Sequence, residues 1–461
     1  MAKRYAVILA AGQGSRMKSK LYKVLHPVAG KPMVGHVADQ LEEMSLDKIV
    51  AVVGHGAEKV KEYLGGRVEY ALQAEQLGTA HAVQQAQSLL MGEEGTTVVV
   101  SGDTPLLTAE SLNAAFDDHE KNQAKVTVLS AQVEDAFGYG RVIRSADGSL
   151  DRIVEEKDAT DEERLIKEIN TGTYFFDNQA LFESLDKVKN DNAQGEYYLP
   201  DVIEILKEQN EKVGAYSIDD VSEALGVNDR KALSQAEMLM RERINEKHMT
   251  NGVTLIDPHS AYIESDVEIG KDTVIEPNVY LKGSTVIGED CVIGMNCVIT
   301  DSRIGDQSTI QSSTIDQSTL ETGVTVGPNA HIRPNSTLKD QVHIGNFVEV
   351  KNSVLGKGTK SGHLTYIGDA DVGEHVNFGC GTIMVNYDGH RKHRSTIGDR
   401  AFIGCNVNLI SPVVLDHDTF IAAGSTITKD VPEDTLALER AEEIHIPGYV
   451  SRQREKWAKD Q

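Results

Sequence analysis

The chain has 461 residues, too many for a single hydrophobic core, so two or three domains are expected. Its 71 acidic residues outnumber its 46 basic ones, and the net charge of −25 repels phosphate backbones, which argues against nucleic acid as a partner. No apolar run is long enough to be inserted in a membrane. The four cysteines have neither CxxC nor zinc spacing, so we expect the reduced thiols of a cytoplasmic protein.

Residues 1 to about 226 alternate strand and helix patterns. Continuous apolar runs predict strands over 5–10, 48–53 and 97–100. Helical periodicity predicts helices over 34–43, 79–90, 109–122 and 198–209. This alternation favours an α/β domain with a Rossmann-like, largely parallel mixed sheet that helices cover on both faces. In such domains ligands bind at the carboxyl ends of the strands.

The end of the first predicted strand carries a glycine-rich motif, LAAGQGSRM over residues 9–17, followed by Lys23. The glycines allow the backbone to approach a ligand, and free N–H groups there can hold phosphates. Arg16 and Lys23 add positive charge. The motif is not a Walker A loop, because no Gly-Lys-Ser/Thr follows. A glycine turn after a strand can also be purely structural, so this motif alone leaves both interpretations open.

Further segments follow in a characteristic order: 73–82 (QAEQLGTAHA), 101–106 (SGDTPL), 138–141 (GYGR), 153–157 (IVEEK), 168–172 (EINTG) and 226–229 (GVND). Singly, an Asp after a strand or an Asn before a helix is often only a helix cap. Taken together with the glycine-rich motif, however, these segments resemble those of the nucleotide-sugar pyrophosphorylases, a nucleotidyltransferase family. Many members of that family have Tyr where this chain has Ser101.

The resemblance implies an in-line attack of a sugar phosphate on the α-phosphorus of UTP, with pyrophosphate leaving. That reaction depends on positioning and charge neutralisation. By resemblance, Asp103 and Asn228 hold a Mg²⁺ ion, a hard cation that prefers oxygen ligands. Arg16 and Lys23 are the implied catalytic residues, stabilising the developing charge. The residues implied in binding UTP and the UDP-sugar are Leu9, Ala10, Ala11, Gly12, Lys23, Gln73, Gly78, Thr79, Gly140, Glu155, Asn170 and Asn228.

The segment after this domain has one long helical pattern without Gly or Pro and rich in strong helix formers. Asn251 and Gly252 end it. We therefore predict a domain over 1–228, a helical linker arm over 229–250 and a second domain over 251–461.

The second domain repeats an aliphatic residue at nearly every sixth position. This period fits neither an amphipathic helix nor a lone strand, but it is typical of a hexapeptide β-helix, in which three hexads close one coil. The alternative, chance spacing in an ordinary β-rich domain, does not account for so many matches. The positions are Ile263, Ile269, Ile275, Leu281, Ile287, Ile293, Ile299, Ile304, Ile310, Ile315, Leu320, Val326, Ile332, Leu338, Ile344, Val350, Leu355, Ser361, Ile367, Val372, Phe378, Ile397, Ile403, Leu409, Leu415, Ile421 and Ile427.

Coil spacing places two cations at one corner of the β-helix. Arg333 and Lys351 are eighteen residues apart, so they belong to successive coils about 4.8 Å apart. Two like charges at that distance repel unless an anion lies between them, which predicts a phosphate site. Two solvated surface cations are the alternative. Tyr366 is expected near the same corner.

Two further features point to chemistry on this domain. His363 follows the weakly apolar hexad start at Ser361, so its side chain is expected at a turn surface, where it suits a general base. The hexads are then interrupted by a basic segment, 385–395 (VNYDGHRKHRS). A loop inserted in a solenoid often marks its binding face.

The segments 362–366 (GHLTY) and 386–389 (NYDG), with the hexads, resemble the left-handed β-helix acyltransferases. The whole order resembles the bifunctional enzymes that make UDP-N-acetylglucosamine for bacterial cell-wall precursors. That resemblance implies that His363 deprotonates the amine of glucosamine-1-phosphate, which then attacks the thioester of acetyl-CoA. It implies glucosamine-1-phosphate binding by Arg333, Lys351, Tyr366, Asn377 and Lys392. It implies acetyl-CoA contacts by Cys380, Asn386, Tyr387, Cys405, Ala423 and Arg440.

The family is trimeric, with each acetyltransferase site formed between neighbouring β-helices and the tail after Pro432 packed on a neighbour. Some members have Ala and Ser where this chain has Cys380 and Cys405. Two other hypotheses stay open: a single-function nucleotide-sugar pyrophosphorylase with a regulatory or assembly β-helix, and a non-enzymatic scaffold. Both predict that His363→Ala leaves all activity intact.

Overall fold

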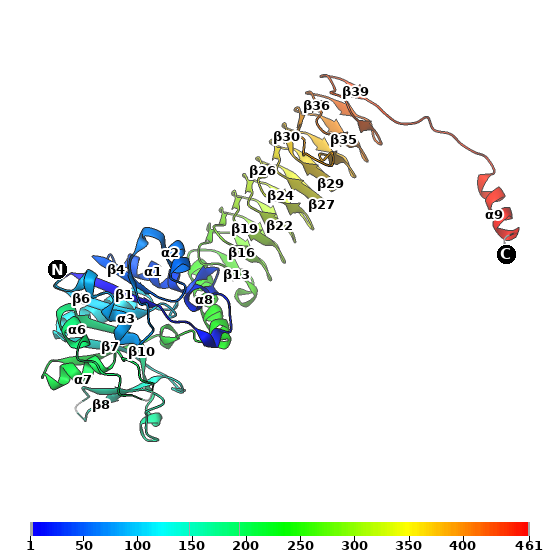
Figure 1. Ribbon diagram of the computed structural model, residues 1–461. Coiled ribbons are helices and arrows are strands. Elements are labelled where there is room, and N and C mark those ends of the chain that lie inside the picture. Colours follow the sequence, from blue (N-terminus) through cyan, green and yellow to red (C-terminus); the bar gives the residue numbers. More distant parts are fainter. Residues whose placement is uncertain (1–2, 147, 193, 460–461) are drawn as a thin grey trace. The chain divides into compact units, whose positions relative to one another are not determined.

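The computed structural model describes residues 3–146, 148–192 and 194–459 (Figure 1). The chain forms two compact units, Met1–Arg243 and Ile244–Gln461. None of the helices described is both long enough and apolar enough to span a membrane.

The first unit alternates strands and helices. Its strands are β1 (Arg4–Ala10), β2 (Pro27–Val28), β3 (Lys31–Pro32), β4 (Lys48–Val53), β5 (Glu69–Leu72), β6 (Thr96–Ser101), β7 (Val126–Gln132), β8 (Gly140–Arg144), β9 (Leu150–Val154), β10 (Glu168–Asp177) and β11 (Val213–Ile218). Its α-helices are α1 (Met33–Glu43), α2 (Ala57–Leu64), α3 (Thr79–Gln84), α4 (Gln87–Leu90), α5 (Ala109–Asn122), α6 (Asn178–Leu185) and α7 (Asp201–Glu208).

The main sheet has the order β11-β7-β10-β6-β1-β4-β5, with β8 and β9 attached beside β10. Strand β1 pairs in parallel with β4 and β6, whereas β10 runs antiparallel to β6 and β7. The predicted mixed sheet is thus confirmed. The predicted helix over 79–90 is two helices, α3 and α4, and the one predicted over 198–209 begins only at Asp201, after Pro200.

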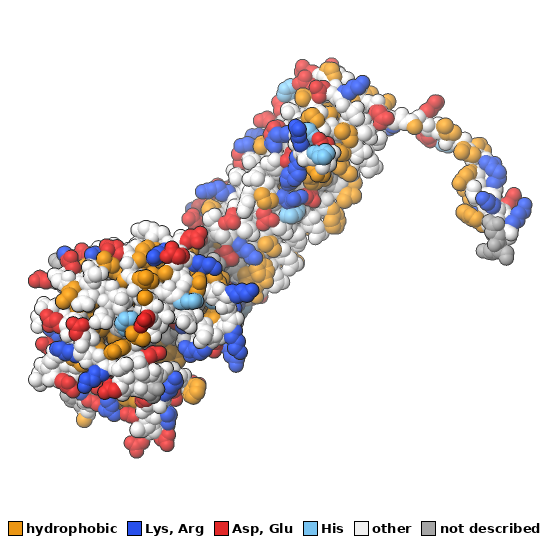
Figure 2. All heavy atoms as spheres, viewed as in Figure 1, with side chains coloured by type: hydrophobic (Ala, Val, Ile, Leu, Met, Phe, Trp, Pro, Cys, Tyr) orange, Lys and Arg blue, Asp and Glu red, His pale blue; other side chains and the backbone are white. Residues whose placement is uncertain are grey.

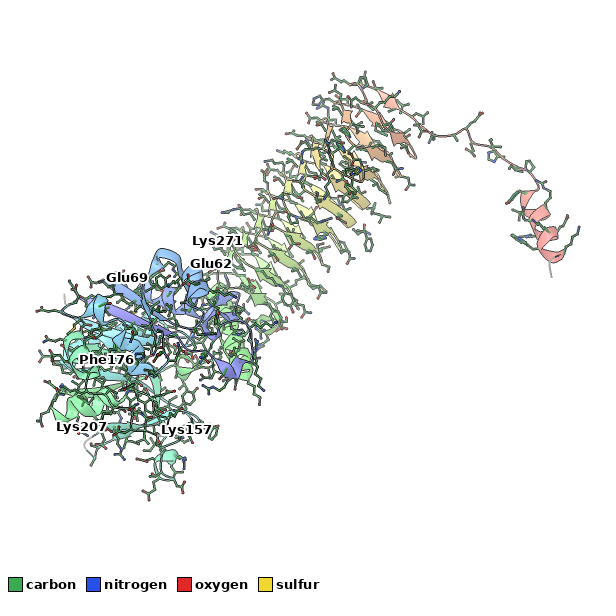
Figure 3. All side chains as sticks on the ribbon, viewed as in Figure 1. Glu62, Glu69, Lys157, Phe176, Lys207 and Lys271 are labelled. Carbon is green, nitrogen blue, oxygen red and sulfur yellow. The ribbon has the colours of Figure 1, made fainter. Side chains whose placement is uncertain are left out.

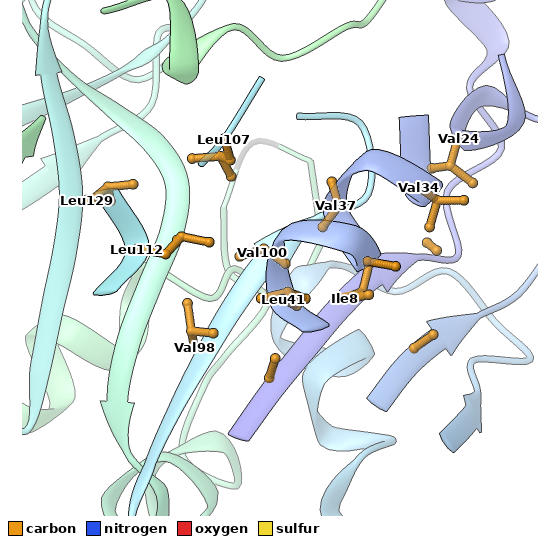
Figure 4. Packing of buried hydrophobic residues seen from close by; sticks show 14 of the residues in the cluster. Ile8, Val24, Val34, Val37, Leu41, Val98, Val100, Leu107, Leu112 and Leu129 are labelled. Atoms are coloured by element: carbon orange, nitrogen blue, oxygen red, sulfur yellow. The ribbon is translucent and has the colours of Figure 1, made fainter. Parts of the chain in front are cut away.

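Successive residues of β1 face opposite sides of the sheet and belong to two separate cores. Ile8 packs with Val34 and Leu41 of α1 on one face (Figure 4), and Val7 packs with Phe176 on the other. In Figure 3, Phe176 lies inside the domain. Because both faces are covered, the carboxyl ends of the central strands form a fixed platform for the site.

The helix α8 (Arg230–Thr250) connects the two units in sequence. Near its middle, Arg243 donates a hydrogen bond to the Leu106 carbonyl of the first unit (2.8 Å). Two residues on, Asn245 donates to the carbonyls of Pro258 and Ala261 in the second unit (2.7 and 3.1 Å).

The second unit consists of short parallel strands in three series. The first series is β12 (Thr254–Leu255), β15 (Val274–Ile275), β18 (Val292–Ile293), β21 (Thr309–Ile310), β24 (Thr325–Val326), β27 (His343–Lys351), β29 (Lys360–Gly368), β31 (Asn377–Phe378), β34 (Phe402–Ile403), β37 (Phe420–Ile421) and β39 (Leu436–Ala437). The second is β13 (Tyr262–Ile263), β16 (Tyr280–Lys282), β19 (Val298–Thr300), β22 (Thr314–Asp316), β25 (His331–Ile332), β32 (Ile383–Val385), β35 (Asn408–Ile410) and β38 (Thr426–Ile427), with β27 and β29 bridging β25 and β32. The third is β14 (Glu268–Ile269), β17 (Val286–Ile287), β20 (Arg303–Ile304), β23 (Thr319–Leu320), β26 (Thr337–Leu338), β28 (Val354–Leu355), β30 (Ala370–Val372), β33 (Ser395–Ile397) and β36 (Val414–Leu415).

The strand register confirms three hexads per coil. Val274 pairs with Val292, eighteen residues on, and His343 pairs with Lys360, seventeen residues on. The step grows to twenty-five between Asn377 and Phe402, because the basic segment is inserted there. All hexad positions named above are buried except Ile269, which is half-buried. The unit is a parallel β-helix of hexapeptide repeats, consistent with the left-handed form. It is followed by α9 (Tyr449–Lys459), which has no buried residue.

Candidate functional site

The glycine-rich motif forms an open loop at the carboxyl end of β1. Gly14 has φ 63°, and a Cβ atom there would lie 2.4 Å from Cβ of Lys23. Any other residue at this position would therefore push Lys23 away. Gly12 has no heavy atom within 4 Å of the position that a Cβ would take, so its backbone is open to a ligand.

Lys23 joins the two residues that the sequence implicates in metal binding. Its ammonium group forms an ion pair with Asp103 and donates to Oδ1 of Asn228 (2.6 Å). Arg16 donates to the same Oδ1 atom (2.8 Å). The N–H of Val227 donates to the Asp103 carbonyl (2.9 Å), which fixes the segment around Asn228 beside the end of β6. The structure therefore brings together all four residues implicated in catalysis or metal binding in this domain.

These groups border two adjoining cavities of about 290 and 360 Å³, which share Leu9, Thr79, Ser101, Asp103 and Glu196. The first is also lined by Ala11, Gly12, Lys23, Gln73 and Gly78. The second is also lined by Gly140, Glu155, Asn170, Tyr198 and Asn228. Ala10 lines neither cavity, and its side chain belongs to the core below. Successive side chains of a strand point to opposite faces of the sheet. Since the side chain of Ala10 points into the core, only the backbone of Ala10 can face a ligand.

The segment expected to bind the nucleobase, residues 73–82, is held by hydrogen bonds and by a close backbone contact. The Gln73 side-chain amide donates to the Gly78 carbonyl (3.1 Å), and Thr79 Oγ1 accepts from the N–H of Leu199 (3.0 Å). Gly78 has φ 120°, and a Cβ atom there would lie 2.4 Å from the Tyr197 carbonyl oxygen. Only glycine fits this contact, which leaves the segment rigid before any ligand binds.

Glu155 lines the second cavity, and Asp201 directly follows Pro200 of its lining. Burial raises the pKa of Glu155, with a smaller contribution from the charge of Asp158. Burial, together with repulsion from Glu204 and other acids, raises the pKa of Asp201 to about 6. Asn170 donates to the Tyr174 hydroxyl (2.7 Å), so its amide has a fixed direction. This cavity therefore offers a carboxyl group, Glu155, and an oriented amide, Asn170, which are hydrogen-bonding groups of the kind that bind sugar hydroxyls.

On the β-helix, His363 is exposed and pairs in register with Asn346 of the preceding coil. Its Nδ1 atom lies 2.8 Å from Oδ1 of Asn346. A carbonyl oxygen only accepts, so this contact places the proton on Nδ1 and leaves Nε2 with its lone pair available. Asn346 was not singled out from the sequence, although its spacing of seventeen residues from His363 could have identified it.

The two cations of the Arg333 corner each have a carboxylate partner within the chain. Arg333 donates to Glu349 (2.6 Å), and Lys351 pairs with Asp369 (3.1 Å). The chain itself provides the neutralising anions, so repulsion between the cations does not by itself require a phosphate. The two carboxylates lie sixteen and eighteen residues after their partners, a spacing of one coil that the sequence also contained.

Lys392 differs from these two cations. It forms no ion pair with any residue that the structure describes, and the adjacent ammonium of Lys351 lowers its pKa. It lies in the inserted segment, where an antiparallel bridge joins it to Tyr387. Figure 2 shows Lys, Arg and His side chains gathered over the coils around β29 and β30. Lys392 is thus a cation without a carboxylate partner beside a neutralised pair.

Asp369 organises the interior of this corner. It is buried and accepts hydrogen bonds from Lys351, Asn352 and Asn386. Asn386 also lies 3.3 Å from the Tyr366 hydroxyl. The implicated residues Lys351, Tyr366 and Asn386 are therefore connected through one carboxylate. Asn377 begins β31 and is half-buried, one coil after Lys360.

The residues implicated in acetyl-CoA binding follow one corner of the later coils. Ile403 pairs with Phe378 on one side and with Ile421 on the other, so Cys380, Cys405 and Ala423, each two residues on, occupy equivalent positions. Arg440 donates to the Ala423 carbonyl (3.2 Å). Tyr387 is exposed and donates to the Gly389 carbonyl within the inserted loop (2.7 Å).

Comparison with known proteins agrees with both halves of this description. Residues 5–222 match the nucleotidyl transferase family, 293–379 match the GlmU-like C-terminal hexapeptide family, and 395–429 match the hexapeptide repeat of succinyl-transferase. The chain is 58% identical over 450 residues to the bifunctional protein GlmU of Listeria monocytogenes EGD-e, covering 98% of each chain. It is 58% identical to the proteins of that name from Geobacillus sp. WCH70, covering 98% of each chain, and Bacillus velezensis FZB42, covering 98% of this chain and 99% of the other.

The chain belongs to the GlmU family of bifunctional proteins. It is accordingly an enzyme with two transferase domains, a nucleotidyltransferase followed by a hexapeptide-repeat acetyltransferase. Family membership and the two domains support a role in UDP-N-acetylglucosamine synthesis.

A divalent cation fits the GlmU-family nucleotidyltransferase site in chemical type. Asp103 and Asn228 offer a carboxylate and an amide oxygen, and both already contact one cationic group, the ammonium of Lys23. Within the described ranges no cluster of three or more His, Cys, Asp or Glu side chains is arranged to hold a metal. Mg²⁺ commonly takes one or two protein oxygens and completes its shell with phosphates and water, so two ligands suffice.

Proposed function

We propose that the chain makes UDP-N-acetylglucosamine in two steps. The β-helix domain (251–461) transfers an acetyl group from acetyl-CoA to glucosamine-1-phosphate. The α/β domain (1–228) joins the resulting N-acetylglucosamine-1-phosphate to UTP and releases pyrophosphate. The helix over 229–250 links the two domains. The observation that carries the proposal is the presence of a separate polar site in each domain. In the α/β domain, Lys23, Asp103 and Asn228 meet at the carboxyl ends of the strands, where such domains bind ligands. On the β-helix, His363 and Asn346 meet on the surface of successive coils.

In uridylyl transfer, the open backbone at Gly12 and the cations Arg16 and Lys23 bind the triphosphate. The braced segment at Gln73 and Gly78 holds the base, and Glu155 and Asn170 bind the sugar. Asp103 and Asn228 would hold Mg²⁺, which supplies charge neutralisation between the phosphates when it is bound. Lys23 already contacts both oxygens, so it is positioned to move from them to a phosphate as negative charge develops.

In acetyl transfer, Nε2 of His363 takes a proton from the sugar amine, and Asn346 keeps the proton on Nδ1. As this proton leaves, the amine nitrogen attacks the thioester carbon and the C–N bond forms. The C–S bond breaks, and the leaving thiolate of coenzyme A takes up the proton from Nε2 of His363 to become the thiol. Lys392 attracts the sugar phosphate together with Arg333 and Lys351. Tyr366, Asn377 and Asn386 place the sugar, while Cys380, Tyr387, Cys405, Ala423 and Arg440 contact acetyl-CoA.

We also propose a cytoplasmic homotrimer assembled through the β-helix. The outer surface of the coils carries stacked, solvent-facing aromatic pairs, Tyr262–Tyr280 and Phe402–Phe420, with ring centroids 4.5 and 4.7 Å apart. In α9, which follows the coils, Trp457 is also exposed. Stacked aromatic rings that face solvent are typical of a surface that is covered in an assembly. Sedimentation equilibrium of the full chain should give three times the chain mass, and a monomer mass would contradict this assembly.

The proposed function is tested on the full chain with two variants, each of which should lose one activity and keep the other. His363→Ala should lower acetyl transfer to glucosamine-1-phosphate by about 10³-fold and leave UTP-dependent pyrophosphate release unchanged. Asp103→Asn should do the reverse. If the native chain does not acetylate the amine, or if His363→Ala leaves that activity intact, a single-function nucleotidyltransferase with an assembly β-helix replaces our proposal.

A further inference from the structure

Cys380 and Cys405 occupy the same position in neighbouring coils. The flanking pairs Phe378–Ile403 and Ile383–Asn408 are both twenty-five residues apart, so the two cysteines between them occupy the same register position on neighbouring coils. The N–H of Asn406 donates to the Cys380 carbonyl (2.8 Å), which holds the two turns together. Each cysteine directly precedes a residue with positive φ, Gly381 or Asn406, so both lie at the same point of the turn.

The same column continues to His363. Ser361 pairs with Phe378 and Tyr366 pairs with Ile383, both at a step of seventeen, which aligns His363 with Cys380. Residue Leu364, directly after His363, also has positive φ. The cysteine pair therefore continues the corner that presents the proposed general base.

The two thiols are accessible and unrestrained. Cys380 is half-buried, Cys405 is exposed, and neither forms a disulfide in the structure. In the described part of the chain, neither sulfur takes part in a hydrogen bond that restrains it, whereas the buried Cys291 and Cys297 each donate to backbone carbonyls. Neighbouring strands are about 4.8 Å apart, within the range of Cα separations of about 4.4–6.8 Å that disulfides span.

We propose that Cys380 and Cys405 form a dithiol site that a peroxide oxidises to an inter-coil disulfide, and that this disulfide stops acetyl transfer reversibly. The loss of acetyl transfer rests on the proposed function of the β-helix; the disulfide itself does not. No role of this kind is needed in either reaction described above.

The chemistry balances with hydrogen peroxide as the oxidant. The Cys405 thiolate attacks a peroxide oxygen, an S–O bond forms, the O–O bond breaks, and the leaving hydroxide takes up a proton as water. The Cys380 sulfur then attacks the sulfenic sulfur of Cys405, an S–S bond forms, the S–O bond breaks, and a second water leaves. Two thiols lose two electrons and two protons, and the peroxide is reduced to two waters.

The disulfide would alter the surface along which acetyl-CoA is proposed to bind. It ties two turns whose separation is otherwise set by backbone hydrogen bonds, one coil from His363. A displacement of about 1 Å between reacting groups can cost about 100-fold in rate. We therefore expect acetyl transfer by the oxidised chain to fall by about that factor.

Peptide mapping tests the bond directly on the full chain. The native protein is reduced, freed of reductant, treated with hydrogen peroxide, alkylated and digested with trypsin without reduction. Arg391, Lys392, Arg394 and Arg400 lie between the two cysteines, so trypsin separates them unless a disulfide joins their peptides. Cys291 and Cys297 serve as internal controls. Both are buried, and burial raises the pKa of Cys297 to about 11, so both should stay reduced.

Activity assays on the same samples decide the consequence. Acetyl transfer should fall by about 100-fold and return with dithiothreitol, while uridylyl transfer stays constant. Cys380→Ala and Cys405→Ser should each lose the dithiothreitol-reversible part of the inhibition, measured against the reduced form of the same variant.

Absence of the linked peptide overturns the proposal, and so does a linked peptide with undiminished acetyl transfer. Equal loss of both activities also overturns it, because the effect would then not be confined to the β-helix site. If the reduced native chain transfers no acetyl group, the proposed function fails, and the linked peptide alone then decides whether the dithiol site exists.

Discussion

The two domains hold their functional cations in different ways. In the α/β domain one ammonium group, Lys23, is shared by Asp103 and Asn228, and the side chains of Lys23 and Asp103 are only 15% and 17% exposed. On the β-helix Arg333 and Lys351 have a carboxylate each, and the side chains of the Arg333–Glu349 pair are both 40% exposed. Water screens charges weakly in the first setting and strongly in the second. A single substitution should therefore matter more in the α/β domain, whereas the β-helix corner should lose its function in smaller steps.

Among substitutions of the cations, the largest effect is expected for Lys23→Ala. Uridylyl transfer should fall by about 10²–10³-fold, because a preorganised positive charge at the phosphates is lost and the carboxylate of Asp103 is left without its partner. Acetyl transfer should not change. Steady-state rates of pyrophosphate release at saturating Mg²⁺ give the comparison. Lys20→Ala removes an exposed lysine of the same loop and serves as the control. Equal losses in the two variants would show that overall charge, not the Lys23 bridge, sets the rate.

A smaller loss is expected for Asn346→Ala on the β-helix. Removing Oδ1 frees the His363 ring to rotate and to exchange its proton between the two nitrogens, so acetyl transfer should fall by about 10²-fold. The loss should appear in kcat, with KM for glucosamine-1-phosphate nearly unchanged. Asn346→Asp keeps an accepting oxygen at the same length and should restore most of the rate. A failure of rescue with unchanged thermal stability would argue against a positioning role.

The two domains also differ in how much of them the sequence could predict. On the β-helix, residues that are one coil apart in sequence are neighbours in space. The hexad core and the corner that carries Arg333 and Lys351 can therefore be predicted from residue spacing. The same arithmetic would have found Glu349, but a surface carboxylate carries no signal of its own until its partner is known.

In the α/β domain, Lys23 and Asn228 are 205 residues apart and meet only because the sheet places their loops at one edge. No local pattern encodes that distance, and only the resemblance to a family linked them. The burial that sets the pKa of Asp201 was also beyond the sequence, since it depends on how α7 packs against the rest of the domain. The break between α3 and α4 was missed because the apolar periodicity continues through it.

A still smaller effect, expected for Lys392→Ala, tests whether water and salt screen the charges of the β-helix more than those of the α/β domain. Lys392→Ala removes a cation that forms no ion pair within residues 3–146, 148–192 and 194–459, so KM for glucosamine-1-phosphate should rise about tenfold with little change in kcat. The ratio of variant to native KM should shrink as salt is added, because the lost interaction is exposed. Lys339→Ala is the control, since that lysine pairs with Glu321 on the same β-helix. A ratio independent of salt would place Lys392 in a buried contact and remove the contrast.

The smallest predicted effect concerns pH and the half-buried carboxyl group of Asp201 in the α/β domain. Asp201 has a folded-state pKa of about 6, whereas an unfolded chain titrates near 3.9. Between these values the folded protein holds a proton that the unfolded chain has lost, so stability falls as the pH rises through this range and stays lower above it.

The Asp201→Asn variant has no ionisable group at this position. The melting temperature of its α/β domain should therefore be about 2 °C above that of the native protein near pH 8 and equal to it near pH 4. Scanning calorimetry of the full chain measures both conditions. Glu208→Gln, at the exposed end of the same helix, should give no pH-dependent difference. If Asp201→Asn shifts the melting temperature equally at both pH values, packing rather than charge burial explains it. In that case the ionised Asp201 would not destabilise the α/β domain. The Lys23 prediction alone would then support the conclusion that water screens charges less in the α/β domain than on the β-helix.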